Sequence, residues 1–416
     1  MYRFEAEISV EQFTEFVKKA SFAPIQQTEA WSKLKNQWKP CFCGIYKDDT
    51  LAGVALILMR KLLPGFVYAY CPRGPIMDLT DEDAVTTFVQ GVKEFCKKHG
   101  VYLLTIDPPV VVGKTLPDME EARYADPFDL SRGKKEFDTV VACGFRHKGF
   151  GKSLDSATQP RYNALIPLKD REGNDLTEDQ FKKNYRQKLR KYMGAFRPAR
   201  GLYYQGADPT EETIAQFKRI LSSTEARQNI SLRNEEYFSL LSQAFGEDAF
   251  FAFERCNVNA YLENLDKRLA KEPENEAKIQ QQKAEAQQVK EQRGDDIPLA
   301  ALLTVYPPNQ EGVRIAEYLY AGSDLSVFSS FCATLCGLFS QCRLCQERNC
   351  DFLNLGGVSG TFDDGLFDFK NPFNPIIVEY AGEFDLPICG WKYTLMNKGL
   401  PVAKKCYSKL RKLVRK

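Results

Sequence analysis

The alternation of apolar and polar positions organises the C-terminal part of the chain around one unit. Residues 317–323 have the pattern of a strand, and residues 325–348 have the period of a long helix. A short apolar strand at 351–355 then enters a glycine-rich turn and a polar loop that ends at Lys370. The spacing predicts a strand, helix and strand whose two ends meet at one edge of a sheet.

A diverged copy of this unit is expected near the N-terminus. Strand patterns at 66–70 and 101–107 flank a helix that Asp81 can cap and that runs to Lys98. A further apolar strand precedes each unit, at 51–59 and 299–306. We therefore predict two related α/β halves; chance similarity between amphipathic segments is the alternative.

The expected domain organisation interrupts the second half with an arm. Residues 258–294 carry Tyr261, Leu265 and Leu269 on one helical face, and then a second helix rich in Gln, Glu, Lys and Ala. The segment is too poor in large apolar residues to be a core, so we predict a protruding antiparallel helical hairpin of coiled-coil type. The predicted units are residues 1–150, residues 151–257 with 295–395, the arm at 258–294, and a basic C-terminal helix at 396–416.

Composition restricts the cellular setting. Of the 416 residues, 44% are hydrophobic, and the net charge is only +2, so affinity for an anion must come from local patches. The longest apolar run, at 51–59, is far shorter than the roughly 20 residues that a membrane-spanning helix needs. With no apolar signal core at the start, the expected location is cytoplasmic. The 13 cysteines, an odd number, are expected to be reduced thiols.

The sequence argues against two common kinds of site, a phosphate-binding loop and a zinc site. A phosphate-binding loop that ended at Gly151, Lys152 and Ser153 would need glycine at position 146, which is Arg146. Cys342 and Cys345 lie on the same predicted helix as other cysteines rather than on paired knuckles, so packing is favoured over a zinc site. With only two histidines in the chain, we expect no metal site and no cofactor.

A basic segment favours a polyanion. Residues 182–200 hold eight Lys or Arg residues with interleaved aromatics and no acidic residue, on a helix expected to span 177–192. A solvated helix face is the alternative. The tail after residue 403 is also basic and carries an apolar stripe, so contact with a membrane surface is a second possibility for it. The candidate contacts in the segment are Lys182, Lys183, Arg186, Lys188, Arg190 and Lys191.

Nine short motifs then occur in an order that resembles the FemABX family, the tRNA-dependent aminoacyltransferases that form peptidoglycan bridges and include FemA-, FemX- and MurM-like enzymes. Each motif is modest alone, but the ordered set covers essentially the whole chain. They are WSKLKNQW at 31–38, RGPIMD at 73–78, YLLTIDP at 102–108, QPR at 159–161, ISLRNEEYF at 230–238, YLYAGS at 318–323, LGGVSG at 355–360, FK at 369–370 and EYAGE at 379–383.

The resemblance implies a fold and a reaction. The fold is α/β (α+β) with two GNAT-like halves, related to the acyl-CoA N-acyltransferases, and the arm resembles that of FemA and MurM-like members. The implied reaction is attack by the side-chain amine of a stem-peptide lysine, or of a growing bridge, on the ester carbonyl of an aminoacyl-tRNA. The implied acceptor is lipid II or UDP-MurNAc-pentapeptide; the arm and the basic tail favour the lipid-linked form, at the inner face of the cytoplasmic membrane. Related bridge-forming transferases are further expected partners.

The resemblance also implies site residues. Lys370, with Phe369, matches the position beside the reacting carbonyl, where a cation would stabilise an oxyanion. Asp107 matches a carboxylate near the attacking amine, as a base or an anchor. The residues that match the lining of the precursor groove are Lys35, Tyr102, Arg233, Tyr237 and Tyr320.

Two other functions are consistent with the same residues. An acetyl-CoA-dependent N-acyltransferase would need a pyrophosphate-binding turn, of which the chain has no clean copy. A non-catalytic module that binds tRNA or a membrane would not need the retained Asp107, Tyr320 and Lys370. The sequence leaves open the amino acid transferred, the bridge position and the identity of the general base.

Overall fold

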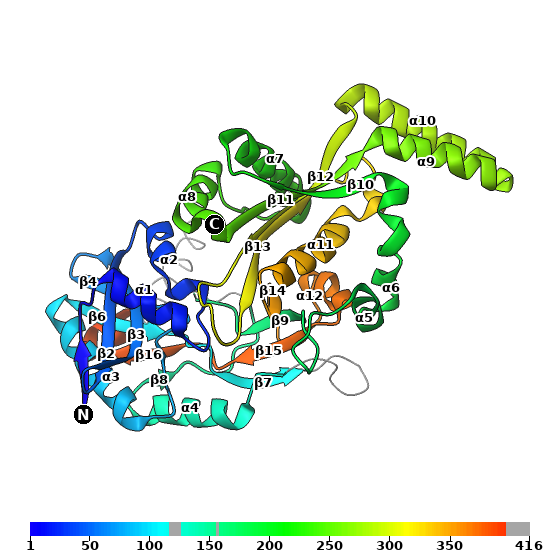
Figure 1. Cartoon of the computed structure of the whole chain (residues 1–416). Coiled ribbons are helices and arrows are strands. Elements are labelled where there is room, and N and C mark those ends of the chain that lie inside the picture. The colour runs from blue at the N-terminus through cyan, green and yellow to red at the C-terminus, as the bar shows by residue number, and fades with distance from the viewer. Residues whose placement is uncertain (116–125, 155–157, 397–416) are drawn as a thin grey trace, which may run out of the picture.

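The computed structural model of the chain describes residues 1–115, 126–154 and 158–396, and contains two mixed sheets side by side (Figure 1). The first sheet belongs mainly to the N-terminal half, and β5 (Ile76–Met77) pairs with β3 beside the main path. Its strand order is β1 (Tyr2–Glu5), β2 (Lys39–Lys47), β3 (Thr50–Leu63), β4 (Phe66–Cys71), β6 (Val101–Ile106), β16 (Phe384–Pro387) and β8 (Arg146–His147).

The second sheet belongs mainly to the C-terminal half and has the longer path. Its strand order is β10 (Leu202–Ala207), β11 (Ala249–Asn257), β12 (Asp296–Val305), β13 (Ile315–Ser323), β14 (Phe352–Val358), β9 (Tyr162–Pro167), β15 (Ile376–Tyr380) and β7 (Val111–Thr115).

The predicted repeat is present in both sheets. In the first, β3 and β4 are antiparallel, α3 (Glu82–Lys98) follows, and β6 returns parallel to β4. In the second, β12 and β13 are antiparallel, α11 (Ala333–Glu347) follows, and β14 returns parallel to β13. The cysteines of α11 at 336, 342 and 345 are fully buried, as the packing interpretation predicted. The fold class of two related α/β halves is therefore confirmed.

Two strands cross the predicted domain boundaries. β7, from residues assigned to the first half, pairs with β15 in the second sheet, and β16, from residues assigned to the second half, pairs with β6 in the first. Figure 1 shows β16 inside the N-terminal half and β7 beside β15. The predicted division into residues 1–150 and residues 151–257 with 295–395 therefore fails for these two strands. Because each strand pairs with the sheet of the other half, backbone hydrogen bonds join the two halves. In the chain between β7 and β8, residues 130–142 form α4 (Leu130–Ala142).

A shared apolar core also joins the halves. α1 (Val10–Lys19) and α2 (Glu29–Leu34) come from the first half, and α7 (Glu211–Gln228) and α8 (Glu235–Phe245) from the second. Their apolar faces form one cluster that includes Phe13, Trp31, Phe217 and Phe238. Burial of large side chains across the junction stabilises one relative placement of the two halves.

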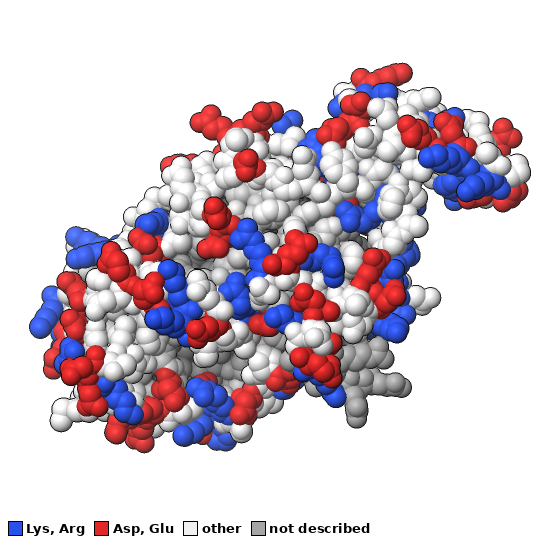
Figure 2. All heavy atoms as spheres, in the orientation of Figure 1, with Lys and Arg blue, Asp and Glu red and all other residues white. Residues whose placement is uncertain are grey.

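The arm is an antiparallel pair formed by α9 (Val258–Lys271) and α10 (Glu276–Arg293), which extends away from the second half in Figure 1. Leu265, Ile279 and Ala286 are buried along it. Lys283 pairs with Asp266 across the two helices, and Lys290 Nζ donates to Asn259 Oδ1 at 2.7 Å. These two helices lie where the helical hairpin was expected, at residues 258–294. In Figure 2, charges of both signs are interspersed over this face of the molecule and over the arm.

Other expectations need correction or fall outside the described residues. The single helix expected at 177–192 is wrong: α5 (Glu178–Asn184) ends at an extended Tyr185, and α6 (Gln187–Arg190) is a separate short helix. The remaining helices are α12 (Gly365–Lys370) and α13 (Gly390–Thr394). The basic C-terminal helix lies outside the described residues, apart from its first position. Among the described residues no helix is long and apolar enough to span a bilayer, and no group of ligating side chains could hold a metal ion.

Candidate active site between the two halves

Lys370 ends a short helix and turns inward. The Asp364 side chain caps α12 by accepting from Phe367 N at 2.7 Å, which sets the helix so that its last residue points into the protein. Lys370 is only 5% exposed, and its Nζ donates to the carbonyl oxygen of Gly357 at 2.6 Å. Burial lowers the pKa of this ammonium to about 8. The neighbouring Phe369 is half-buried, 6.5 Å from the Phe373 ring.

The Gly357 carbonyl is accessible to Lys370 because β14 bulges there. The pairing of β14 with β9 shifts register between Asn354 and Gly357. A Cβ at Gly357 would lie 2.6 Å from the Pro160 side chain, so only glycine lets the strand pass this proline. Gly356 has a φ of 81°, which favours glycine as well. The glycine turn predicted after 351–355 is thus the acceptor for the candidate catalytic lysine.

Asp107 follows β6 and is completely buried. Its Oδ1 accepts from Arg73 N at 2.6 Å, and its Oδ2 accepts from Tyr70 OH at 2.8 Å and from Gln159 N at 3.1 Å. Burial raises the pKa of the carboxyl to about 6, against the opposing effect of Arg73. The geometry therefore makes Asp107 the residue that joins β4, β6 and the loop before β9.

Arg73, held by Asp107, lies at the junction of the halves. Its φ of 50° is in the left-handed region, and Asp107 fixes this backbone through its N–H. Its Nη2 donates to Pro160 O at 2.6 Å, and the guanidinium lies 4.4 Å from the centre of the Tyr380 ring. Its Nη1 is buried and has no hydrogen-bond partner among the described residues.

A cavity of about 160 Å³ is lined by residues of both halves, including Arg73 and Gly357. The first half contributes Pro24 and Gln26 to its wall; the second half contributes strand residues of β13 and β14. Its wall contains polar side chains to which sequence analysis gave no role, among them Arg73, Glu317 and Asn354. Glu317 could have been recognised as a candidate site residue from the sequence, because it is a charged residue inside an otherwise apolar strand pattern.

Four of the predicted precursor-binding residues form one cluster. Lys35, just after α2, lies with its Nζ 4.6 Å from the Trp31 ring centre. Burial and the nearby Arg233 lower the pKa of Lys35 to about 8. The Arg233 guanidinium lies 5.1 Å from the ring centre of Tyr237, and Tyr320 OH donates to Tyr237 OH at 3.4 Å. Residues from both halves therefore present two cations and two phenols together.

Tyr102 lies apart from this cluster. It is 3% exposed near the start of β6, with its ring centre 5.7 Å from that of Phe66. Within the described residues, no hydrogen bond or ring contact joins Tyr102 to Lys35 or Arg233. The structure therefore groups four of the five predicted groove residues and not the fifth.

The basic segment adjoins the helix that carries Lys370. Arg186 N donates to Pro372 O at 2.9 Å, and Arg186 Nε donates to Asn371 Oδ1 at 3.0 Å. Lys182 pairs with Glu178 at 2.8 Å, and Arg190 Nε donates to Tyr185 O at 2.7 Å. The exposed members of the predicted set are Lys183, Arg186, Lys188, Arg190 and Lys191.

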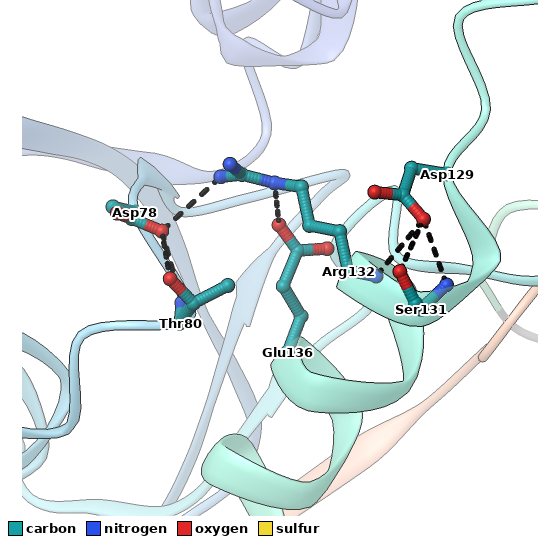
Figure 3. Close-up of polar contacts among 6 residues, drawn as sticks. All are labelled: Asp78, Thr80, Asp129, Ser131, Arg132 and Glu136. Carbon is teal, nitrogen blue, oxygen red and sulfur yellow. Dashed lines mark hydrogen bonds and ion pairs between the residues drawn. The ribbon is translucent and has the colours of Figure 1, made fainter.

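A second, larger cavity of about 520 Å³ meets the first at Arg73 and Tyr380. Its polar rim, shown in Figure 3, centres on Arg132 of α4, whose Nη2 donates to Asp78 at 3.1 Å and whose Nε donates to Glu136 at 2.9 Å. Two carboxylates thus surround one guanidinium, so this rim offers no unneutralised cation for an anion. None of the predicted site residues lines this cavity.

Comparisons with known proteins agree on one family. The model of the FemAB family matches residues 8–285 and 266–398. Aminoacyltransferase FemA of Staphylococcus aureus strain MRSA252 is 23% identical over 420 residues, covering 92% of this chain and 94% of the relative, and strain N315 gives the same values.

Solved structures show the same fold. The crystal structure of FemX superposes with a TM-score of 0.76 at 22% identity, covering 94% of this chain and 99% of that one. A conserved protein of unknown function from Bacteroides thetaiotaomicron superposes with a TM-score of 0.51 at 11% identity, covering 92% and 99%.

Proposed function

Because the chain belongs to the FemAB family and is an aminoacyltransferase, we propose that it transfers an amino acid from aminoacyl-tRNA to an amine of a peptidoglycan precursor. The acceptor amine belongs to the stem-peptide lysine or to a bridge residue already added. The observation that carries the proposal is a largely buried ammonium, Lys370, held beside a cavity at the junction of the two halves.

The precursor diphosphate is assigned to Lys35 and Arg233. Two cations that approach each other closely enough to lower one pKa are costly unless an anion neutralises them. A diphosphate provides that anion, and a guanidinium can bind two of its oxygens at once. Tyr237 and Tyr320 lie against the same pair and offer hydroxyls or ring faces to a sugar or a base.

The cavity and the cluster are close enough for one extended ligand. Glu317 lines the cavity, and Tyr320, three positions further along β13, belongs to the cluster. At about 3.3 Å per strand residue the two positions are about 10 Å apart. A precursor bound through its diphosphate can therefore extend its peptide amine towards Lys370.

The donor tRNA is assigned to the basic segment. Its exposed cations surround Arg186, which is hydrogen-bonded to the residue after Lys370. An acceptor stem bound along Lys183, Lys188, Arg190 and Lys191 would bring its aminoacylated end to the same helix. The arm is a second candidate surface for tRNA.

The chemistry follows from these positions. The neutral acceptor amine attacks the ester carbonyl, and Lys370 stabilises the oxyanion of the tetrahedral intermediate. The C–N bond forms, the ester C–O bond breaks, and the ribose hydroxyl of tRNA leaves with a proton that originates from the amine. The half-buried Phe369 forms part of the surface beside the reacting carbonyl.

We further propose that the acceptor is lipid II rather than the soluble UDP-MurNAc-pentapeptide, at the inner face of the cytoplasmic membrane. The arm and the basic tail at 403–416 are the basis for this assignment. Related bridge-forming transferases are proposed as further partners.

A direct assay tests the proposal. Protein is incubated with charged tRNA and a lysine-containing precursor, either lipid II in detergent or its soluble nucleotide form, and the precursor is analysed by mass spectrometry. A mass gain of one aminoacyl residue is expected. Transfer that acetyl-CoA supports and charged tRNA does not would overturn the donor assignment, and tRNA binding without product would indicate a non-catalytic module.

A further inference from the structure

We infer that Glu317 is the group that accepts the proton of the attacking amine. This inference rests on the proposed aminoacyl transfer and adds a catalytic residue to it. It comes from a comparison of the two carboxylates that lie nearest the junction of the halves, Asp107 and Glu317.

Asp107 presents no exposed oxygen to a substrate amine. Both of its oxygens accept hydrogen bonds, from Arg73 N and from Tyr70 OH and Gln159 N, and none of its surface is exposed. A carboxylate so occupied positions the turn at Arg73. It would have to release that turn before it could receive a proton from the substrate.

Glu317 has the opposite arrangement. Its Oε2 accepts from Asn354 Nδ2 at 2.9 Å, and no described residue donates to its Oε1. The side chain lines the cavity and is half-buried rather than sealed. One oxygen therefore holds the carboxylate in place while the other is available to a ligand.

The same cavity wall connects Glu317 to Lys370. Asn354, the partner of Glu317, accepts from Gly356 N through its Oδ1 at 2.8 Å. The next residue, Gly357, accepts from Lys370 Nζ at 2.6 Å. A carboxylate that lines the cavity and an ammonium that is hydrogen-bonded to a residue of its wall are thus fixed to one bulged strand end, an arrangement suited to transfer of an amine proton beside an oxyanion.

The surroundings favour proton exchange near neutral pH. Burial raises the pKa of Glu317 to about 7, while Arg73 across the cavity opposes the rise. Other titratable groups near this cavity are Tyr318 on β13 and Tyr380 on β15, which line it and whose pKa values burial raises, Lys370 beyond Gly357, and Asp107 behind Arg73. An ionised Glu317 is basic enough to take a proton and acidic enough to return it.

The step balances without a further reactant. As the amine nitrogen bonds to the ester carbon, its excess proton moves to Glu317 Oε1. When the C–O bond breaks, the same proton passes to the departing ribose oxygen. Glu317 returns to its ionised state, and the products are an amide and an uncharged tRNA.

Glu317→Gln tests the inference, because it keeps the size and the acceptor for Asn354 but cannot take a proton. Single-turnover transfer from charged tRNA is expected to slow by about 100-fold or more, with an unchanged precursor dissociation constant and an unchanged unfolding midpoint. The wild-type rate should rise with pH through a limb near 7 that Glu317→Gln lacks, and Glu317→Asp should restore part of the rate and this limb.

The matched control is Glu347→Gln, at an exposed glutamate of α11 outside the cavity, which should transfer at the wild-type rate. If the wild type transfers the amino acid and Glu317→Gln does so at the same rate, the assignment of Glu317 is overturned while the proposed function stands. Failure of the wild type to transfer from charged tRNA would overturn the proposed function and this inference with it.

Discussion

Lys370 Nζ donates a 2.6 Å hydrogen bond to the carbonyl oxygen of Gly357, at the point where β14 bulges. This contact fixes a cation to a residue of the cavity wall before any substrate is present. A preorganised charge needs little rearrangement when an oxyanion develops, which is why such groups contribute strongly to catalysis. The relationship leads directly to the first prediction.

Replacing Lys370 with methionine should lower the turnover number by about 100-fold to 1,000-fold while precursor affinity changes little. Because burial lowers the pKa of Lys370 to about 8, the ammonium is present below that pH and is lost above it. Wild-type turnover should therefore decline as pH rises through 8, and Lys370→Met should lack this decline. Rapid-quench assays across pH measure both, with exposed Lys135→Met as the control. An unchanged alkaline limb in Lys370→Met would contradict the assignment.

Arg233→Ala should weaken precursor binding by about 1.5–3 kcal/mol, the value of a hydrogen bond to a charged group. Arg233 is exposed in the unliganded protein, so its loss should leave the unfolding midpoint unchanged. Isothermal titration with the precursor measures the affinity. Arg171→Ala, at an exposed arginine in the turn after β9, is the control. Equal affinity of both variants for the precursor would remove Arg233 from the groove.

Precursor binding at pH 8 should take up protons. Lys35 has a pKa of about 8 because of burial and of Arg233, so part of the population is neutral at that pH. A bound diphosphate favours the ammonium and raises the pKa, which draws a proton from the buffer. Calorimetry in buffers of different ionisation enthalpy measures this uptake, and Lys35→Met should reduce it. Uptake of the same size in both proteins would assign it to another group.

Neutralising the exposed basic segment should weaken binding of the charged tRNA and leave binding of the precursor unchanged. Lys188, Arg190 and Lys191 changed to glutamine should raise the Michaelis constant for charged tRNA and flatten its dependence on salt, since fewer counterions are released. The control triple changes Lys97, Lys98 and Lys135, exposed lysines on α3 and α4. A salt slope that matches the wild type would exclude the segment from the tRNA site.

Asp107→Ala should act on stability. It removes the acceptor of three hydrogen bonds and leaves two backbone N–H groups, of Arg73 and Gln159, without that partner. At about 1–3 kcal/mol for each unsatisfied group, the free energy of unfolding should fall by about 2–6 kcal/mol. Urea denaturation measures this change, and Asp49→Ala in the exposed β2–β3 turn should shift stability by less than about 0.5 kcal/mol. A fully stable Asp107→Ala protein would show that these bonds are replaced.

The sequence predicted the parts of the fold that have a local pattern. Both strand–helix–strand units and the arm follow from periodicity, because each buries one face along its own length. The exchange of β7 and β16 has no such signal: both strands are short, and each pairs with a partner far away in the chain. The break at Tyr185 has a tertiary cause as well, since this side chain is buried beside Cys342.

The residues of the candidate site also fall into those that the sequence predicted and those that it did not. Lys370 and the Lys35–Arg233 pair were found because short motifs resemble a family, and their meeting across the junction depends on α2 packing against α8. Glu317 was missed because a glutamate in a strand reads as a solvent-facing residue. Only Asn354 from β14 and Arg73 from the turn after β4 make it a half-buried carboxylate with one open oxygen.

The most direct test of the central claim is single-turnover transfer from charged tRNA to a lysine-containing precursor, followed by mass spectrometry, for the wild type and Lys370→Met together. The account predicts that the wild-type precursor gains one aminoacyl residue through an amide to the lysine side chain, and that the variant forms this product at least about 100-fold more slowly. An unmodified precursor with the wild type, or equal rates for the two proteins, would contradict it.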